Sequence, residues 1–358
     1  LSQVTNPSFD PIREELVMSL TEYIGRVGSG ILTPDASNCK MVRLPQPVLT
    51  NGQLDILCNI RYKGFNTVKL PILVEISKGE SGLRRAIEDI CKKAEQSVDE
   101  GVNYIILSDR DIDASHAAIP SLLAVSAVHH YLIGVGKRVQ TALIVESGEI
   151  REIMHVALLL GYGASAINPY MTFAVLDNLV KKHLIQEEYK TAEQNYIKAV
   201  DKGLKKVMSK MGISTIRSYR GAKIFEAVGI SEDLLRRYFG TEMSTIGGIG
   251  LREIARDAIR MHDAGFEIRD IKPFLPNNGL FSFRKDGIEH AWNPETIATL
   301  QIATRLGSYK KFKEWSQMVD EKESPIFLLD FLNFKKGPKT IPLEEIEPAE
   351  SIVRTFVT

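Results

Sequence analysis

The sequence predicts an α/β fold in which βα units build a parallel sheet resembling an incomplete TIM-like barrel, followed by a largely helical second half. Two observations support this fold class. Between residues 67 and 185, short apolar runs alternate with longer amphipathic stretches, and the units repeat about every 30 to 38 residues. The short runs are continuously apolar and rich in β-branched residues, which is typical of parallel strands covered on both faces.

The βα units supply four strands, which are too few for a complete barrel. A partial barrel and a doubly wound sheet both fit this number. The strands are expected at residues 68–74, 104–107, 139–145 and 164–167, and the helices at residues 83–98, 119–133, 150–160 and from residue 170.

The first 66 residues look irregular, because prolines interrupt any long element. One helix start is visible there. Asp10 is suited to cap this helix, Pro11 fits its first turn, and Glu14 and Glu15 favour the positive end of its dipole.

The chain becomes helical after residue 185. Residues 187–211 carry apolar side chains at helical spacing, and Gly212 stands where a helix C-terminal cap is expected. Further helices are expected at residues 222–227, 233–239, 251–262 and 294–306. The predicted domains are an α/β core at residues 1–213, a helical second half packed on it at 214–334, and a connector at 335–358.

The composition excludes two classes of protein. Lys plus Arg and Asp plus Glu both number 45, so the zero net charge excludes a generally basic nucleic-acid binder. No apolar run approaches the ~20 residues that span a bilayer, so no membrane segment is expected. The start at Leu1, without a signal pattern, predicts a piece cut from a longer chain. The separated Cys39, Cys58 and Cys91 predict reduced thiols in the cytoplasm, with no metal site.

Polar side chains follow the predicted strands. Ligand sites in parallel α/β folds lie at the carboxyl ends of strands, so these residues would form a rim around a small-molecule site. Capping of the helices that follow is the alternative, and it explains most of the Ser and Asp residues. The predicted rim consists of Glu75, Ser77, Ser108, Asp109, Glu146, Ser147 and Asn168.

Other motifs define no chemical site. Gly247, Gly248 and Gly250 would cradle a phosphate, but a loop leading into a helix explains them better because no convincing strand precedes them. The adjacent His129 and His130 point to different helix faces, so they do not form a metal-binding pair. The residues therefore predict no catalytic, cofactor-binding or metal-binding set.

A series of ordered blocks carries a family resemblance. They begin with Gln3-Val4-Thr5-Asn6-Pro7 and the Asp10-Pro11 helix start, and they continue at residues 141–170, 202–229, 244–257 and 346–353. These blocks span essentially the whole chain. They resemble the central domain of the glutamate synthase large subunit, which in that family lies between a glutaminase domain and an FMN-binding barrel.

The resemblance implies the chemistry of a parent enzyme, an oxidoreductase of glutamate biosynthesis and nitrogen assimilation. Glutamine is hydrolysed, ammonia passes through an internal tunnel to 2-oxoglutarate, and FMN hydride reduces the imine to glutamate. Electrons arrive through an iron–sulfur cluster, from an NADPH-dependent small subunit or from ferredoxin. This chain lacks the N-terminal cysteine nucleophile and the cluster cysteines, so the segment is expected to be inactive alone.

The resemblance further implies a noncatalytic scaffold that holds the glutaminase and FMN-binding domains and helps to wall the ammonia tunnel. Thr5 and Asn6 match a segment near that tunnel and are carried over as tunnel-lining or domain-interface residues. Holding the N-terminal turn is the alternative role for both. The alternative functions are a stand-alone enzyme that uses Glu75, Asp109 and Glu146 at the strand ends, and an anion-binding module at residues 247–250.

Overall fold

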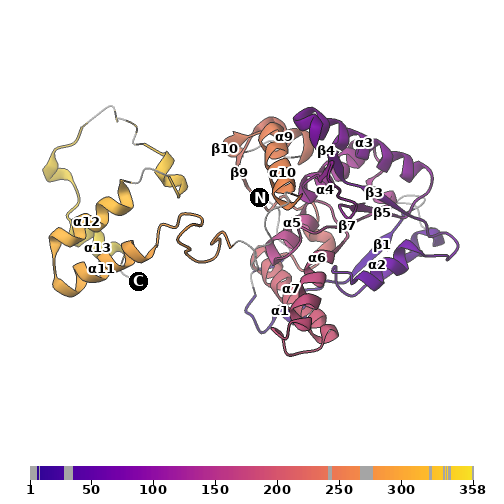
Figure 1. The fold of residues 1–358 in the computed structure, drawn as a ribbon, viewed down its shortest axis with the longest axis horizontal. Coiled ribbons are helices and arrows are strands. Elements are labelled where there is room, and N and C mark those ends of the chain that lie inside the picture. The colour runs from indigo at the N-terminus through magenta and orange to yellow at the C-terminus, as the bar shows by residue number, and fades with distance from the viewer. Residues whose placement is uncertain are drawn as a thin grey trace. The chain divides into compact units, whose positions relative to one another are not determined.

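A computed structural model gives the fold of the chain (Figure 1). It describes residues 6–7, 9–27, 35–240, 244–266, 277–321, 325–333, 335, 337 and 340–356. The chain forms two compact units, Leu1–Ile268 and Arg269–Thr358. The finer division expected after residues 213 and 334 stays a prediction.

The first unit is built on a four-stranded parallel sheet with the order β3-β5-β7-β8. Successive strands are added in one direction, as in a barrel, whereas a doubly wound sheet reverses its order. The predicted α/β class with barrel-like βα units is thereby confirmed. The strands are β3 (Thr67–Pro71), β5 (Tyr104–Ser108), β7 (Ala142–Glu146) and β8 (Ala166–Asn168), and the connecting helices are α3 (Gly79–Asp99), α4 (Ser121–Gly134) and α5 (Ile153–Gly161).

Both faces of the sheet are buried, and different parts of the chain cover them. Ile105 and Val145 belong to the core cluster that includes α3, α4 and α5. Ile106 and Ile144 belong to a second cluster, which includes Leu44 and side chains of α2 (Asn51–Cys58). Strand residues buried on both faces explain the continuous apolar runs in the sequence.

The first 66 residues are more regular than the sequence suggests. β1 (Glu22–Gly25) and β2 (Met41–Leu44) pair as antiparallel strands, and α2 follows them. The Asp10 carboxylate accepts hydrogen bonds from the backbone N–H groups of Ile12 and Arg13, both at 3.0 Å. The helix after this turn, α1 (Glu14–Val17), is four residues long.

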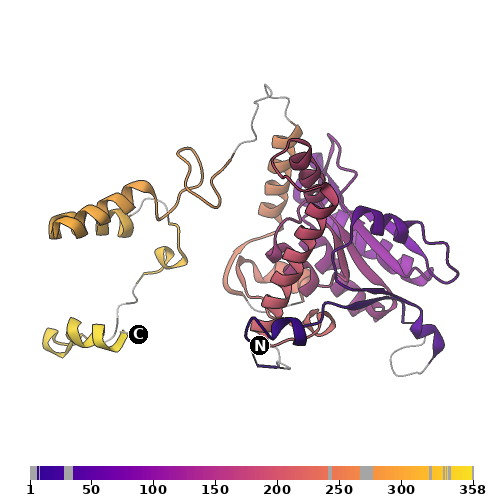
Figure 2. The ribbon, with the colours of Figure 1, turned by 90° about the horizontal axis from the view of Figure 1, so that it is seen from below.

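A helical layer completes the first unit. The helix predicted at residues 187–211 is α7 (Tyr189–Met211), which runs beside α5 and α6 (Tyr170–Lys181) (Figure 2). It ends at Gly212, whose φ of 67° gives the expected left-handed cap. α8 (Ile216–Tyr219) contacts α5, α9 (Glu232–Tyr238) contacts α4, and α10 (Leu251–Phe266) contacts α3.

Three segments differ from the sequence expectations. Residues 222–226 are not helical, and β9 (Ala227–Ile230) follows them, paired in parallel with β10 (Ser244–Ile249). Gly247 and Gly248 therefore lie in a strand and not in a phosphate-binding loop. A Cβ atom on Gly248 would stand 2.2 Å from the Gly229 carbonyl oxygen, so close strand packing explains this glycine.

The strand expected at residues 68–74 is split into β3 and β4 (Leu73–Glu75). β4 pairs as an antiparallel strand with β6 (His116–Ala118).

The second unit consists of short helices with little apolar core. The Asn293 side chain caps the start of α11 (Pro294–Leu306) by accepting hydrogen bonds from two backbone N–H groups. Gly307, in the left-handed conformation, caps its end. α12 (Tyr309–Asp320) and α13 (Ala349–Phe356) follow. In the described part of this unit the buried apolar residues are two alanines, whereas Leu306 and Leu329 are 72% and 74% exposed.

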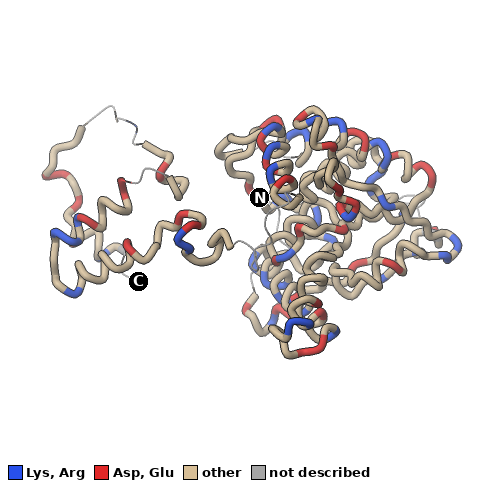
Figure 3. Tube along the Cα trace, in the orientation of Figure 1, with Lys and Arg blue, Asp and Glu red and all other residues tan. Residues whose placement is uncertain are grey.

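Charge and hydropathy follow simple patterns along the described residues. Cationic and anionic residues are interspersed along the trace (Figure 3). Among the helices of the described ranges, none is both long enough and apolar enough to cross a bilayer.

Candidate functional site

The carboxyl ends of β5, β7 and β8 gather five of the predicted rim residues. Ser108, Asp109, Glu146, Ser147 and Asn168 are each at most 2% exposed. They lie together because the strands are parallel and their register places Ser108 beside Glu146, and Glu146 beside Asn168. We refer to these five residues as the strand-end cluster.

Glu146 is the charged centre of the strand-end cluster. Its carboxylate accepts hydrogen bonds from the Ser108 hydroxyl at 2.6 Å and from Arg110 Nε at 2.5 Å. Lys69 Nζ lies 2.8 Å from the same carboxylate. Burial favours the protonated acid, but these three donors outweigh burial and hold the pKa of Glu146 below its usual value. Because three donors occupy its oxygens, the carboxylate serves as an ion-pair acceptor and not as a free base.

Asp109 forms a neighbouring network. Its carboxylate accepts hydrogen bonds from the Ser147 hydroxyl at 2.6 Å and from the Gly148 N–H at 3.0 Å. The Arg110 guanidinium stacks over the Tyr170 ring, 4.2 Å from the ring centroid, and covers this end of the cluster. Burial raises the pKa of Asp109. These bonds fix the turn that follows β7, in keeping with the hydrogen-bonding alternative.

Asn168 joins the sheet to the segment that covers its second face. Its Nδ2 donates to the Leu49 carbonyl at 2.9 Å and to Asn51 Oδ1 at 3.0 Å. Its Oδ1 is buried without a hydrogen-bond partner among the described residues. Asn168 thus anchors the N-terminus of α2 to the end of β8.

The other two predicted rim residues lie apart from the strand-end cluster. Glu75 ends β4, outside the four-stranded sheet, because that strand pairs with β6. Its carboxylate accepts a hydrogen bond from the Ser77 hydroxyl at 2.6 Å and pairs with Lys78. Both bonds lower the pKa of Glu75, and the bond from Lys78 has the larger effect. The structure therefore does not bring Glu75 together with Asp109 and Glu146.

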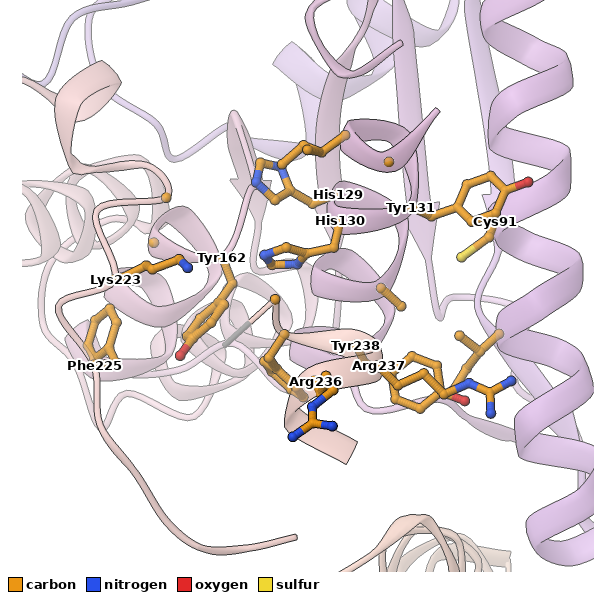
Figure 4. A pocket seen from close by; sticks show the side chains of 18 of the residues that line it. Cys91, His129, His130, Tyr131, Tyr162, Lys223, Phe225, Arg236, Arg237 and Tyr238 are labelled. Carbon is orange, nitrogen blue, oxygen red and sulfur yellow. The ribbon is translucent and has the colours of Figure 1, made fainter. Parts of the chain in front are cut away.

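A pocket of about 770 Å³ lies between α3, α4, α9, the end of α8 and the loop that follows it at residues 220–225 (Figure 4). We call it the helix pocket. Sequence analysis missed it because its lining comes from distant segments without a shared motif, and the His129-His130 pair was its sole visible signal. Its lining includes Cys91, His130, Tyr162, Lys223, Phe225 and Arg236.

Both pocket histidines are neutral near pH 7. Burial, reinforced by Arg138, lowers the pKa of His129 to about 2, and His129 Nδ1 accepts a hydrogen bond from Arg138 Nε at 2.7 Å. Burial also lowers the pKa of His130, whose Nδ1 lies 2.9 Å from the Ser126 carbonyl oxygen. In the neutral ring this Nδ1 carries the proton and donates it. His129 therefore joins α4 to Arg138, His130 bonds within α4, and neither imidazole brings charge to the pocket.

The residues carried over from the family resemblance lie at the start of the chain. Thr5 lies outside the described residues. The Asn6 N–H donates to the Gly212 carbonyl at 2.9 Å, and the Phe9 N–H donates to the Ser209 hydroxyl at 3.3 Å. The N-terminal segment is therefore attached to the C-terminal end of α7.

The three cysteines occupy separate environments. Cys39 is exposed, Cys58 is half-buried and Cys91 is buried, and all three are free thiols. Burial raises the pKa of Cys91 to about 12, so this thiol is protonated and unreactive near neutral pH. Within the described ranges, no three His, Cys, Asp or Glu side chains come together in a metal-binding arrangement.

Residues 1–231 match the family of the glutamate synthase central domain. This match covers more than half of the chain. The chain belongs to the glutamate synthase family. Curated relatives extend the similarity to the residues beyond the central-domain match.

The glutamate synthase large chain (NADPH) of Bacillus subtilis is 42% identical over 357 residues, which cover 100% of this chain and 23% of that protein. Glutamate synthase (NADH) of Schizosaccharomyces pombe is 39% identical over 368 residues, covering 100% and 17%. Ferredoxin-dependent glutamate synthase of Pyropia yezoensis is 34% identical over 370 residues, covering 100% and 24%. The chain thus spans a quarter or less of the length of these glutamate synthases.

Solved structures give a weaker likeness. A mandelate oxidase variant superimposes with a TM-score of 0.33 and 12% identity, covering 60% of this chain and 91% of that protein. A flavocytochrome b2 variant gives a TM-score of 0.31 and 15% identity, covering 45% of this chain and 40% of the other. Scores this low carry no argument about the glutamate synthase segment.

Proposed function

We propose that this chain is a noncatalytic central segment of a glutamate synthase that scaffolds the glutaminase and FMN-binding domains of the parent enzyme. That enzyme converts glutamine and 2-oxoglutarate to two molecules of glutamate. The names of the relatives include NADPH, NADH and ferredoxin, so the electron donor is a reduced nicotinamide or ferredoxin. We place the enzyme in the cytoplasm, where reduced thiols such as Cys39, Cys58 and Cys91 are usual.

One observation carries the scaffold role. Among its described residues, the second unit exposes large apolar side chains, and the apolar residues that it buries there are alanines. Soluble proteins rarely leave extended apolar surface in water, and large exposed patches mark interaction sites. Side chains of this kind are suited to pack against another domain of the parent chain. Exposed members include Phe281, Leu306, Tyr309, Leu329, Phe331 and Leu343.

The strand-end cluster supports a noncatalytic role. A flavin phosphate at this edge would meet the buried carboxylates of Asp109 and Glu146, whose donors are already engaged. The strand-end cluster therefore does not fit FMN. The iron–sulfur cluster does not fit either, because the three cysteines differ in burial and form no group. Both cofactors are assigned to other parts of the parent enzyme.

The tunnel role is assigned to the N-terminal segment. Ammonia must stay out of bulk water, because protonation would give ammonium, which is no nucleophile. A wall built from a fixed segment excludes water better than a loose linker. The bond from the Asn6 N–H to the Gly212 carbonyl fixes such a segment at Asn6, and Thr5 and Asn6 are assigned to the tunnel or to a domain interface from the family resemblance.

Two experiments test this function. The purified chain, given FMN, 2-oxoglutarate, ammonium and a reductant, is expected to form no glutamate, and steady turnover would refute the noncatalytic assignment.

In the parent enzyme, deletion of this segment is expected to abolish glutamine-dependent glutamate synthesis while the isolated glutaminase domain still hydrolyses glutamine. Full glutamine-dependent synthesis without the segment would refute the scaffold.

A further inference from the structure

The helix pocket has the charge of an anion site. Four cationic residues line it, Lys92, Lys223, Arg236 and Arg237, against one acid, Glu88. Glu88 is paired with Arg237 at 2.8 Å. Arg236 has a loose contact of 4.0 Å with Glu232, and both of these side chains are mostly exposed. The chain as a whole has zero net charge, so this local excess of cations is a property of the pocket.

Helix dipoles do not cancel this excess. α4, α5 and α9 all end at the pocket, and a helix C-terminus carries about half a negative elementary charge. The terminal carbonyls are bonded within the chain: the Tyr162 N–H donates to the Leu158 carbonyl at 2.9 Å, and the Gly221 N–H donates to the Gly161 carbonyl at 2.8 Å. These partial charges are smaller than the full charges of the cations around them.

One wall of the pocket is aromatic. Tyr162 stacks with Phe225 at a centroid distance of 5.9 Å and meets the edge of Phe239 at 5.3 Å. All three side chains are neither fully buried nor fully exposed. Flat aromatic faces of this kind bind planar rings by stacking.

Lys223 is held toward the pocket by an uncommon backbone conformation. Its φ of 52° is in the left-handed region, which few residues other than glycine adopt, and it follows Gly221 with a φ of 71°. Figure 4 shows its side chain extending toward His130 and Tyr162. The amine therefore lies between the aromatic wall and α4, where it can meet the charged end of a bound molecule.

A buried polar group in the lining also lacks a partner. Tyr238 is 5% exposed, and its hydroxyl has no hydrogen-bond partner among the described residues. Buried hydroxyls are usually bonded, so such a group calls for a physical reason. Figure 4 shows the Tyr238 side chain extending toward α3, away from Lys223 and Tyr162, so a ligand oxygen that bonds this hydroxyl would lie on the α3 side of the pocket.

We propose that the helix pocket binds a small anion that carries a planar ring, with the ring against Tyr162 and Phe225 and the anionic group at Lys223 and Arg236. A nucleotide and a simple aromatic carboxylate share this chemistry. The volume of about 770 Å³ is in the range of ligand-binding sites. This site is separate from the scaffold surface of the second unit, so either assignment can fail without the other.

Calorimetric titration of the full chain with AMP, adenosine, inorganic phosphate and benzoate tests the site. We expect saturable binding of AMP or benzoate, and at least about tenfold weaker binding of adenosine and phosphate, which each offer half of the chemistry. Tighter AMP binding would identify a nucleotide site, and tighter benzoate binding an aromatic-acid site. No saturation by either probe up to about millimolar concentration would overturn the proposal.

Matched variants locate the binding. Lys223→Gly keeps the left-handed backbone and removes the amine, so affinity should fall about tenfold. Arg236→Gln should also weaken binding about tenfold. It replaces Lys223→Gly in the test if circular dichroism shows that Lys223→Gly unfolds at a lower temperature than the parent chain. Lys206→Gln, exposed on α7 and outside the pocket, is the control and should bind as the parent does. Equal affinities for all three variants would overturn the proposal.

Discussion

At the scale of single residues, Glu146 shows how a polar strand end becomes structural. The side chain is 2% exposed, yet three donors surround it, so its charge is held within the sheet edge. The side chains of Lys69 and Arg110 are 38% and 42% exposed, so water also solvates their charges. A buried acid with half-exposed partners is stable only while it is ionised.

Glu146→Gln removes this charge and keeps the shape of the side chain. We expect the free energy of unfolding at pH 7 to fall by about 2 kcal/mol, measured by urea unfolding, because a charge-assisted network is lost. The folded pKa lies below the ordinary value of 4.5, so the contribution is present above that value and is lost as pH falls through the folded pKa. The difference in the free energy of unfolding between the parent chain and Glu146→Gln should therefore become smaller in acid. Glu187→Gln, at an exposed site, is the control, and a gap that stays constant in acid would contradict the role of the charge.

Asn6→Ala in the parent enzyme tests the other single residue that matters for the proposed function. Its side chain is assigned to the ammonia path, so glutamine hydrolysis should continue while glutamate formed per glutamine hydrolysed falls about twofold or more, as ammonia escapes. Ammonia release and glutamate are measured together. Asn195→Ala, on the exposed side of α7, is the control. An unchanged ratio in Asn6→Ala would remove this residue from the tunnel.

Sequence reasoning placed Ser108, Asp109, Glu146, Ser147 and Asn168 at one edge, because parallel strands align their carboxyl ends. It did not find the partners of Glu146, since which cation reaches a buried acid depends on tertiary packing. Glu75 was misplaced for a related reason. A short antiparallel pairing with β6 takes that residue out of the four-stranded sheet.

At the scale of elements, β9 and β10 are the clearest departure from the sequence pattern. Their glycines resemble a loop, and weak β-propensity is overridden here by close pairing of two strands. The long helix α7 was predictable, because helical spacing and a terminal glycine agree. The helix pocket was not, since α3, α4, α9 and a loop form it only after folding.

Gly248→Ala tests the close approach of β9 and β10. A Cβ atom there would stand 2.2 Å from the Gly229 carbonyl oxygen, so the strands must separate, and the free energy of unfolding should fall by about 2 kcal/mol. Gly247→Ala is the matched control, because a Cβ atom at Gly247 meets nothing within 4 Å. Thermal unfolding of both variants gives the comparison. Equal loss of stability in the two variants would contradict the steric account.

At the scale of the whole molecule, the two units differ in how they treat apolar residues. The first unit buries a continuous core on both faces of its sheet. In the part of the second unit that the structure describes, large apolar side chains such as Phe281 and Leu343 are in contact with water. A chain with this contrast is suited to work inside a larger assembly, as proposed.

Leu306→Glu tests the exposed apolar surface. In the purified chain the change should lower the fluorescence of a hydrophobic dye, because one large exposed group is lost. In the parent enzyme, burying the new charge against a neighbouring domain should reduce glutamate synthesis about tenfold or more. Lys310→Glu, an exposed charge reversal on α12, is the control. Full activity of Leu306→Glu would show that this face is not covered.

The attachment of the N-terminal segment to α7 has a consequence for biosynthesis. The partner of Phe9 lies 200 residues later in the chain, so a ribosome must translate most of the first unit before that bond can form. At roughly 5 to 20 residues per second, the opening segment waits for about 10 to 40 seconds. Until α7 is made the opening segment has no attachment site, which makes the nascent polypeptide a natural client for co-translational chaperones.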